Sequence, residues 1–194
     1  MKIKPLTGLC LLVAALLSTG LAAAGEATPE NTGLSVGQRA PAFTLKDQND
    51  KEVSLEDLLK KGPVALVFFR SADWCLYCKL QVVQLQRNLE EFKASGGQVV
   101  GISFDSVEVL QRFSKRSTIT FPLLSDVGSK TIDAFDIRDK ESSKGNSYHG
   151  TFVIDQQGVV RAKLFQVSYQ ERPAVEALIK ALKEARNLNG EKKP

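Results

Sequence analysis

Two cysteines stand three positions apart directly after a strongly apolar segment. Val64 to Phe69 is a continuous apolar run, and Trp74-Cys75-Leu76-Tyr77-Cys78 follows it, just before a long helical pattern. A short apolar run of this kind is typical of a buried strand, so the cysteines lie where a strand is followed by a helix. Two thiols with this spacing can close a disulfide reversibly, which favours a redox function.

The expected helix places the two thiols in different surroundings. Cys75 is predicted to open the helix, and Cys78 to lie about one turn later on the face that packs inward. A helix N-terminus presents unpaired N–H groups and a partial positive charge, which favour a thiolate. One thiol can therefore attack a substrate while the other resolves the mixed disulfide.

Two other uses of the cysteines remain open. A permanent structural disulfide would close a very short loop and contribute little stability. Structural zinc requires four ligands. Cys10 lies in the N-terminal segment that is predicted below to be removed, so the mature chain offers only Cys75, Cys78 and the single histidine, His149. We therefore favour redox exchange, with no metal or organic cofactor.

The N-terminus has the pattern of a secretory signal. Lys2 and Lys4 precede an apolar stretch from Leu6 to Leu21, and Ala22-Ala23-Ala24 provides the small residues that signal peptidase recognises. Residues 1–24 are therefore predicted to be a signal peptide, and the protein to be periplasmic or secreted. An uncleaved membrane anchor is the alternative, although the apolar stretch is short for a spanning helix.

The remaining chain is long enough for one domain with a proper core. Residues 25–35 are predicted to be a flexible leader, 36–186 a single domain, and 187–194 a polar tail. The 26 basic and 22 acidic residues are nearly balanced, which gives no indication of nucleic acid binding. No stable membrane insertion is expected once the signal is removed.

The domain alternates strand-like and helix-like patterns, which predicts an α/β fold with a mostly parallel sheet and helices on both faces. Ser106 is the expected N-cap of the helix that carries Val107, Leu110 and Phe113. Strands are predicted at 64–69, 99–104, 121–124, 151–154 and 159–165, and helices from 75 to the Gly96-Gly97 pair, from 107, over 129–135 and over 172–186. The residues at 155–158 are predicted to form a hairpin turn.

Four segments resemble the peroxiredoxin branch of the thioredoxin-like proteins, the alkyl hydroperoxide reductase/thiol-specific antioxidant family. They are GQRAPAFTL at 37–45, GISFDS at 101–106, FPLLSD at 121–126 and TFVID at 151–155. The resemblance covers residues 35 to 180. It implies a thioredoxin-like fold with an N-terminal peroxiredoxin-type extension, and peroxide or disulfide chemistry.

The site departs from the family pattern at several positions. When the family's Pro-x-x-x-Thr-x-x-Cys segment is placed with its peroxide-attacking cysteine on Cys78, Ser71 takes the proline position and Cys75 the threonine position. The family's arginine falls on His149, and its glutamate on Gln81. In the other template, the thioredoxin-type exchange enzymes, Cys75 would attack and Cys78 resolve, but the facing cis-proline is missing.

Four more residues are candidate supports of the site. Arg70 can pair with a carboxylate or stabilise a thiolate, or it can simply place a charge at the end of the strand. Trp74 and Tyr77 can cover the thiols and contact a partner, or simply pack at the start of the helix. His149 can favour a thiolate when protonated or move a proton, because the charge of a histidine changes near neutral pH. A lone histidine can also be structural or face the solvent.

We therefore expect an exported, peroxiredoxin-like antioxidant enzyme that cycles between dithiol and disulfide at Cys75 and Cys78. Its partners would be a peroxide and an external thiol reductant such as a thioredoxin-like donor. Two alternatives stay open. One is a thioredoxin-like protein disulfide reductase acting on exported proteins, and the other is a redox-inert domain with a structural disulfide.

Overall fold

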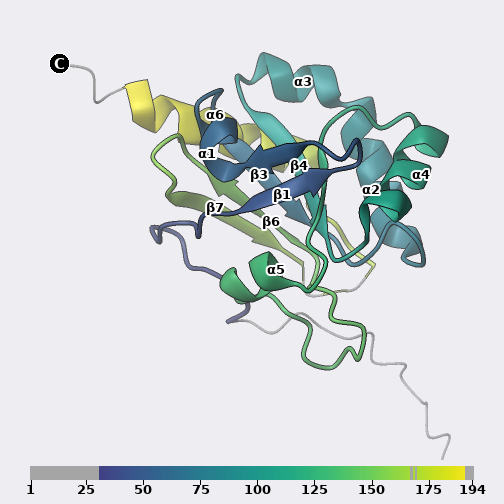
Figure 1. The fold of residues 1–194 in the computed structure, drawn as a ribbon. Helices are drawn as coiled ribbons and strands as arrows, with labels where there is room; N and C mark the ends of the chain where they lie inside the picture. The colour runs from purple at the N-terminus through teal and green to yellow at the C-terminus, as the bar shows by residue number, and fades with distance from the viewer. Residues whose placement is uncertain (1–30, 167, 169, 191–194) are drawn as a thin grey trace, which may run out of the picture.

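A mixed sheet forms the centre of the protein (Figure 1). The computed structural model describes residues 31–166, 168 and 170–190, and within them the strands are β1 (Thr44–Asp47), β2 (Glu52–Ser54), β3 (Val64–Phe68), β4 (Gln98–Ser103), β5 (Leu123–Ser125), β6 (Gly150–Ile154) and β7 (Val160–Phe165). Their order across the sheet is β2-β1-β5-β4-β3-β6-β7. The predicted α/β class is confirmed. The expectation of a mostly parallel sheet is wrong, because β3, β4 and β5 are parallel neighbours whereas the strands toward both edges pair antiparallel.

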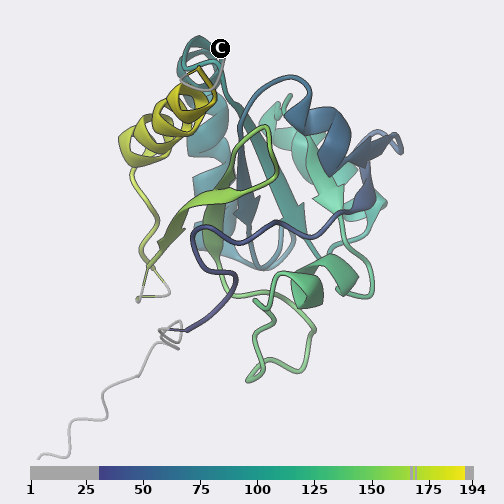
Figure 2. The same ribbon diagram turned by 90° about the vertical axis from the view of Figure 1, so that its left-hand side faces the viewer.

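Helices cover both faces of the sheet, as predicted. Successive side chains of a strand point to opposite faces, so residues 65, 67 and 69 join one core and residues 64, 66 and 68 the other. The first core packs against α2 (Leu76–Arg87), α3 (Leu89–Ala94), α4 (Val107–Ser117) and α6 (Val175–Gly190), and the second against α1 (Leu55–Leu59) and α5 (Lys130–Ala134). Figure 2 shows the yellow α6 and the blue segment with α1 on opposite sides of the sheet.

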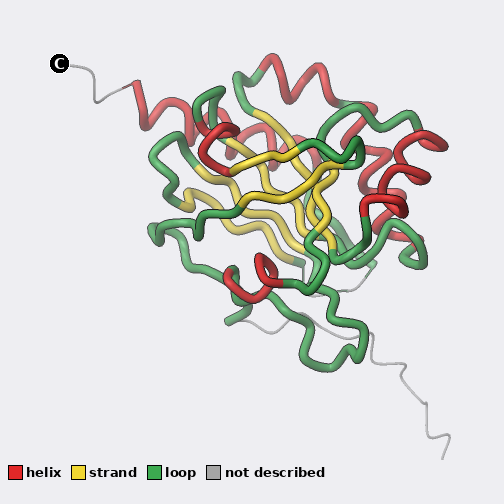
Figure 3. The backbone as a smooth tube through the Cα atoms, in the orientation of Figure 1, coloured by secondary structure: helices red, strands yellow, loops and turns green. Residues whose placement is uncertain are grey.

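Most predicted elements are present, with changes at their ends (Figure 3). The helix predicted to reach Gly96 is interrupted at Asn88, where α2 ends and α3 begins. The Asn88 side chain donates a hydrogen bond to the Gln84 carbonyl at 2.8 Å, and such a local bond competes with the helical backbone. No element was predicted between residues 44 and 59, where β1, β2 and α1 form.

The ends of the domain extend further than predicted. Thr32 is buried, and the Gly33 N–H donates to the Asp136 carbonyl at 2.8 Å, so this part of the predicted leader packs against the domain. Helix α6 continues to Gly190, past the predicted end of the domain at residue 186. The predicted signal peptide lies outside the described residues. Among those that are described, no helix combines the length and the hydropathy that crossing a bilayer requires.

Candidate active site

A buried carboxylate fixes the turn between β3 and α2. Asp105, which follows β4, accepts hydrogen bonds from the Ser71 hydroxyl at 2.8 Å and from the Ala72 N–H at 2.6 Å. The Ser103 hydroxyl donates to the same carboxylate at 2.8 Å. Burial raises the pKa of the Asp105 carboxyl, while these three donors act in the opposite direction. Ser71, at the family's proline position, thus ties the turn to the neighbouring parallel strand.

The turn places both cysteines at the start of α2. Cys75 is the N-cap residue, with φ −90° and ψ 100°, and its sulfur accepts a hydrogen bond from the Cys78 N–H at 3.3 Å. The two residues form a disulfide with their Cα atoms 5.3 Å apart, and both are buried. The prediction that Cys75 opens the helix and Cys78 faces inward is confirmed.

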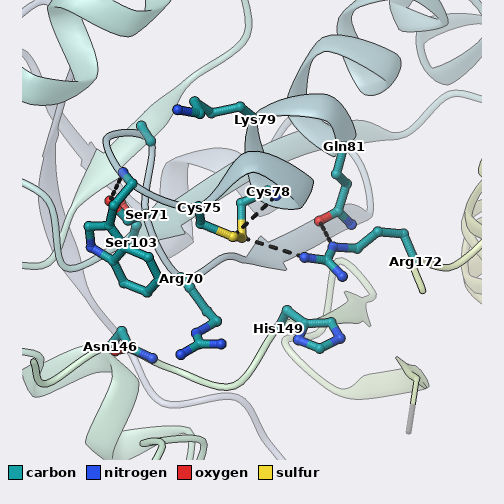
Figure 4. The surroundings of a disulfide bond; sticks show 12 residues. Arg70, Ser71, Cys75, Cys78, Lys79, Gln81, Ser103, Asn146, His149 and Arg172 are labelled. Atoms are coloured by element: carbon teal, nitrogen blue, oxygen red, sulfur yellow. Dashed lines mark hydrogen bonds between the residues drawn. A yellow bond between two sulfur atoms is a disulfide. The ribbon is translucent and has the colours of Figure 1, made fainter. Parts of the chain in front are cut away.

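Arg172 is a site residue that the sequence analysis missed. Its Nη2 lies 3.5 Å from the Cys78 sulfur, and its Nε donates to the Gln81 side-chain oxygen at 2.9 Å (Figure 4). Gln81, at the family's glutamate position, is buried one turn beyond Cys78. The two contacts hold the guanidinium beside one sulfur of the pair.

The topology explains how a residue so distant in sequence reaches the cysteines. Gly150, at the start of β6, pairs with Phe68 at the end of β3 and with Phe165 at the end of β7. The connection from β7 to α6, which carries Arg172, therefore begins at the edge of the sheet where β3 gives way to the cysteine turn. The position of an arginine after the last strand was the one sequence signal that pointed to it.

His149 lies at the same edge, directly before β6. Its Nε2 is 3.2 Å from the Ser168 carbonyl, and in Figure 4 the ring lies between Arg70 and Arg172 on one side of the disulfide. Burial, together with the positive charges of Arg172 and Arg70, lowers the pKa of His149 to about 4. The expectation that His149 changes charge near neutral pH is therefore wrong, because the imidazole is neutral there.

Arg70 and Trp74 form a rim beside the pair. The Arg70 guanidinium is 3.7 Å from the Asp139 carboxylate, and its part in the chemistry stays a prediction. Its central carbon lies 5.1 Å from the centre of the Trp74 ring, and the Lys144 ammonium lies 4.5 Å from the same ring. Trp74 thus has two cations within cation–π distance of its ring. Tyr77 lies half-buried in the first turn of α2, and its role stays a prediction.

The lowered pKa of His149 predicts a loss of stability in acid. The imidazole binds a proton with a pKa near 6.5 in the unfolded chain and of about 4 in the folded protein. The stability that the neutral His149 contributes is fully present above pH 6.5. As the pH falls toward 4 it is lost, and the free energy of unfolding decreases by roughly 3 kcal/mol. Denaturant unfolding of the oxidised protein at a series of pH values measures this slope.

The matched variant is His149→Gln, which cannot be protonated. We expect its free energy of unfolding to depend less on pH between 6.5 and 4 than that of the wild type, by roughly the same 3 kcal/mol. The chain has a single histidine, and Asp105 is present in both proteins, so their difference isolates His149. Parallel curves for the two proteins would contradict the assignment.

Comparisons with known proteins agree with this fold. The solved structure of peroxidoxin BcpB from Mycobacterium tuberculosis is similar with a TM-score of 0.67 and 26% identity, over 80% of this chain and 98% of that one. Peroxiredoxin Bcp of Escherichia coli (strain K12) is 34% identical over 131 residues, which are 66% of this chain and 83% of that protein.

A plant relative and a family profile extend the match. Chloroplastic peroxiredoxin Q of Populus jackii is 32% identical over 170 residues, covering 85% of this chain and 77% of that protein. Residues 36–163 match the sequence profile of the AhpC/TSA family. The chain therefore belongs to the AhpC/TSA family and is a peroxiredoxin-like thiol peroxidase of thioredoxin-like fold.

Proposed function

We propose that the protein is an exported antioxidant enzyme in which Cys78 attacks peroxide and Cys75 resolves the product. The observation that carries the assignment is the Arg172 guanidinium, 3.5 Å from the Cys78 sulfur. A cation beside a thiol favours the thiolate, which is the nucleophile. Cys78 also occupies the position of the peroxide-attacking cysteine in the family segment.

The proposed cycle has three steps. The Cys78 thiolate attacks one oxygen of the peroxide, the O–O bond breaks, and Cys78 becomes a sulfenic acid while the other oxygen leaves as an alcohol or as water after taking up a proton. The Cys75 thiolate then attacks the Cys78 sulfur, the disulfide forms, and the sulfenic oxygen leaves as hydroxide, which takes up a proton to become water. Finally, a dithiol reductant supplies two electrons and two protons and is itself oxidised to a disulfide.

The geometry suits resolution in place. Helix α2 begins at Leu76 with the Cys75–Cys78 disulfide closed, so the bond joins the N-cap residue to the first turn of an intact helix. The second step therefore needs no unwinding of α2. This supports a cycle in which the two cysteines alternate between dithiol and disulfide.

A second candidate is a protein disulfide reductase, with Cys75 as the attacking thiol. It is favoured by the position of Cys75 at the N-cap, where its sulfur accepts the Cys78 N–H and lies near the positive end of the helix. The redox-inert reading differs from both, since it predicts no reaction with peroxide and no exchange with other disulfides.

Single serine variants separate these functions. The reduced protein is mixed with stoichiometric hydrogen peroxide, and Trp74 fluorescence and free thiols are followed by stopped flow. We expect fast loss of both thiols in the wild type, a sulfenic acid on Cys78 in the Cys75→Ser variant, and consumption no faster than by free cysteine in Cys78→Ser. A dimedone adduct located by mass spectrometry identifies the oxidised residue.

Two results would contradict the proposal. A sulfenic acid that forms on Cys75 in Cys78→Ser, with none on Cys78 in Cys75→Ser, would reverse the roles of the cysteines. Peroxide consumption by the wild type no faster than by free cysteine, combined with rapid exchange against a protein disulfide, would assign the protein to the reductases.

The export part of the proposal rests on the signal pattern at residues 1–24 and has its own test. Expression of the full chain in a Gram-negative host should yield a periplasmic protein whose mass corresponds to a start at Gly25. The control is Ala24→Leu, which places a large residue at the cleavage site and should leave an uncleaved, membrane-bound chain. A full-length protein in the cytosolic fraction would contradict export.

A further inference from the structure

The outer face of α2 carries exposed leucines beside the redox pair. Leu76 is 60% exposed and Leu80 is 57% exposed, and residues four apart lie next to each other on a helix surface. Val83 continues the same face and is partly buried against the core. Single exposed apolar residues need no explanation, whereas an apolar group on one helix face indicates an interaction site.

This face begins at the redox pair. Leu76 directly follows Cys75, the N-cap residue of α2, whereas Cys78 points inward on the opposite side of the helix. Both cysteines are themselves buried in the oxidised protein, so a reducing thiol must displace side chains to reach the disulfide. A protein that binds the leucines gains free energy from these contacts, and this gain can offset the cost of displacing the side chains. A small thiol makes no such contacts.

Helix α2 is basic, and the exposed Asp73 is the acidic residue of the turn that precedes it. Helix α2, from Leu76 to Arg87, contains no acidic residue and carries Lys79 and Arg87. The Lys79 ammonium donates to the Asp73 carbonyl at 2.8 Å, which places it at the turn that leads into the helix. Lys144 adds a further cation over the Trp74 ring. A partner with a negatively charged surface is complementary to this region.

We propose that Leu76, Leu80 and Lys79 form the docking surface for an acidic protein dithiol that reduces the Cys75–Cys78 disulfide. The inference rests on the proposed function. One thiolate of the partner attacks a sulfur of the disulfide and forms a mixed disulfide, and the partner's second thiol then releases it. The partner leaves as a disulfide, and Cys75 and Cys78 take up the two protons.

A second copy of this chain fits the surface less well. In a symmetric dimer the same patch contacts itself, so Lys79 and Arg87 of one copy would face the same two cations of the other. Like charges placed opposite each other oppose association. The basic character of the helix therefore favours an acidic partner over self-association.

The test compares a protein reductant with a small one. The oxidised protein is reduced either by a reduced thioredoxin of net negative charge or by dithiothreitol, with Trp74 fluorescence as the readout. We expect the variants Leu76→Glu and Leu80→Glu to slow reduction by thioredoxin by about tenfold or more. Reduction by dithiothreitol should stay within about twofold of the wild-type rate, because the small dithiol does not use the surface.

Two controls address charge and position. Lys79→Glu should also slow the thioredoxin reaction alone, and added salt should slow it in the wild type. Leu188→Glu changes a leucine that is 44% exposed on α6, and should alter neither rate. Peroxide consumption driven by dithiothreitol is measured in parallel. If the wild-type protein consumes no peroxide in this assay, the proposed function is refuted, whatever the docking result.

Several outcomes would overturn the docking surface. They are an unchanged thioredoxin rate in the leucine variants, equal slowing with both reductants, and a wild-type protein that thioredoxin reduces no faster than dithiothreitol does. A dimer that Leu76→Glu converts to a monomer in sedimentation would instead assign the surface to a second copy of the chain.

Discussion

The position of the redox pair depends on one buried carboxylate at the C-terminal edge of the sheet. Asp105 accepts hydrogen bonds from Ser71 and Ala72, so the chain that leaves β3 is tied to the end of β4. Removing a carboxylate from water is costly unless its oxygens are hydrogen-bonded, and the donors of the turn meet that requirement. The turn in turn places Cys75 at the N-cap of α2 and Cys78 on the inward face. The start of α2 is therefore fixed by Asp105, which lies in the loop after the neighbouring strand β4.

Positive charge at the site comes from guanidinium groups rather than from the histidine. Because the pKa of His149 is lowered to about 4, its imidazole is neutral at neutral pH. Arg172 lies beside the Cys78 sulfur, and Arg70 pairs with Asp139 at the rim. Burial of a thiol disfavours its charged form, whereas an adjacent cation favours it. The structure thus places a neutral histidine and a charged arginine near the pair, and under the proposed function it is the arginine that favours the Cys78 thiolate.

Features that depend on nearby residues were predictable from the sequence, and features that join distant segments were not. The β3 strand, the Ser106 cap of α4 and the β6–β7 hairpin each follow from residues a few positions apart. The contact between Arg172 and Cys78 spans 94 residues and depends on β7 lying beside β6. The antiparallel edges of the sheet likewise depend on long-range pairing. His149 was identified as a site residue, but its pKa depends on burial and on two arginines that local sequence does not bring together.

The central claim is that Arg172 activates Cys78, and the pH profile of Cys78 alkylation tests it most directly. The rate of iodoacetamide reaction is measured from pH 4 to 10 in Cys75→Ser, in Cys75→Ser/Arg172→Gln, and in Cys75→Ser/Arg70→Gln as the matched loss of a nearby arginine. The account predicts a midpoint below the value of about 8.5 for free cysteine in Cys75→Ser, and an increase of about one to three pH units when Arg172 is replaced. The Arg70 variant should show a smaller increase, since its charge is paired with Asp139. A midpoint that does not move on loss of Arg172, or that moves as far on loss of Arg70, would contradict the account.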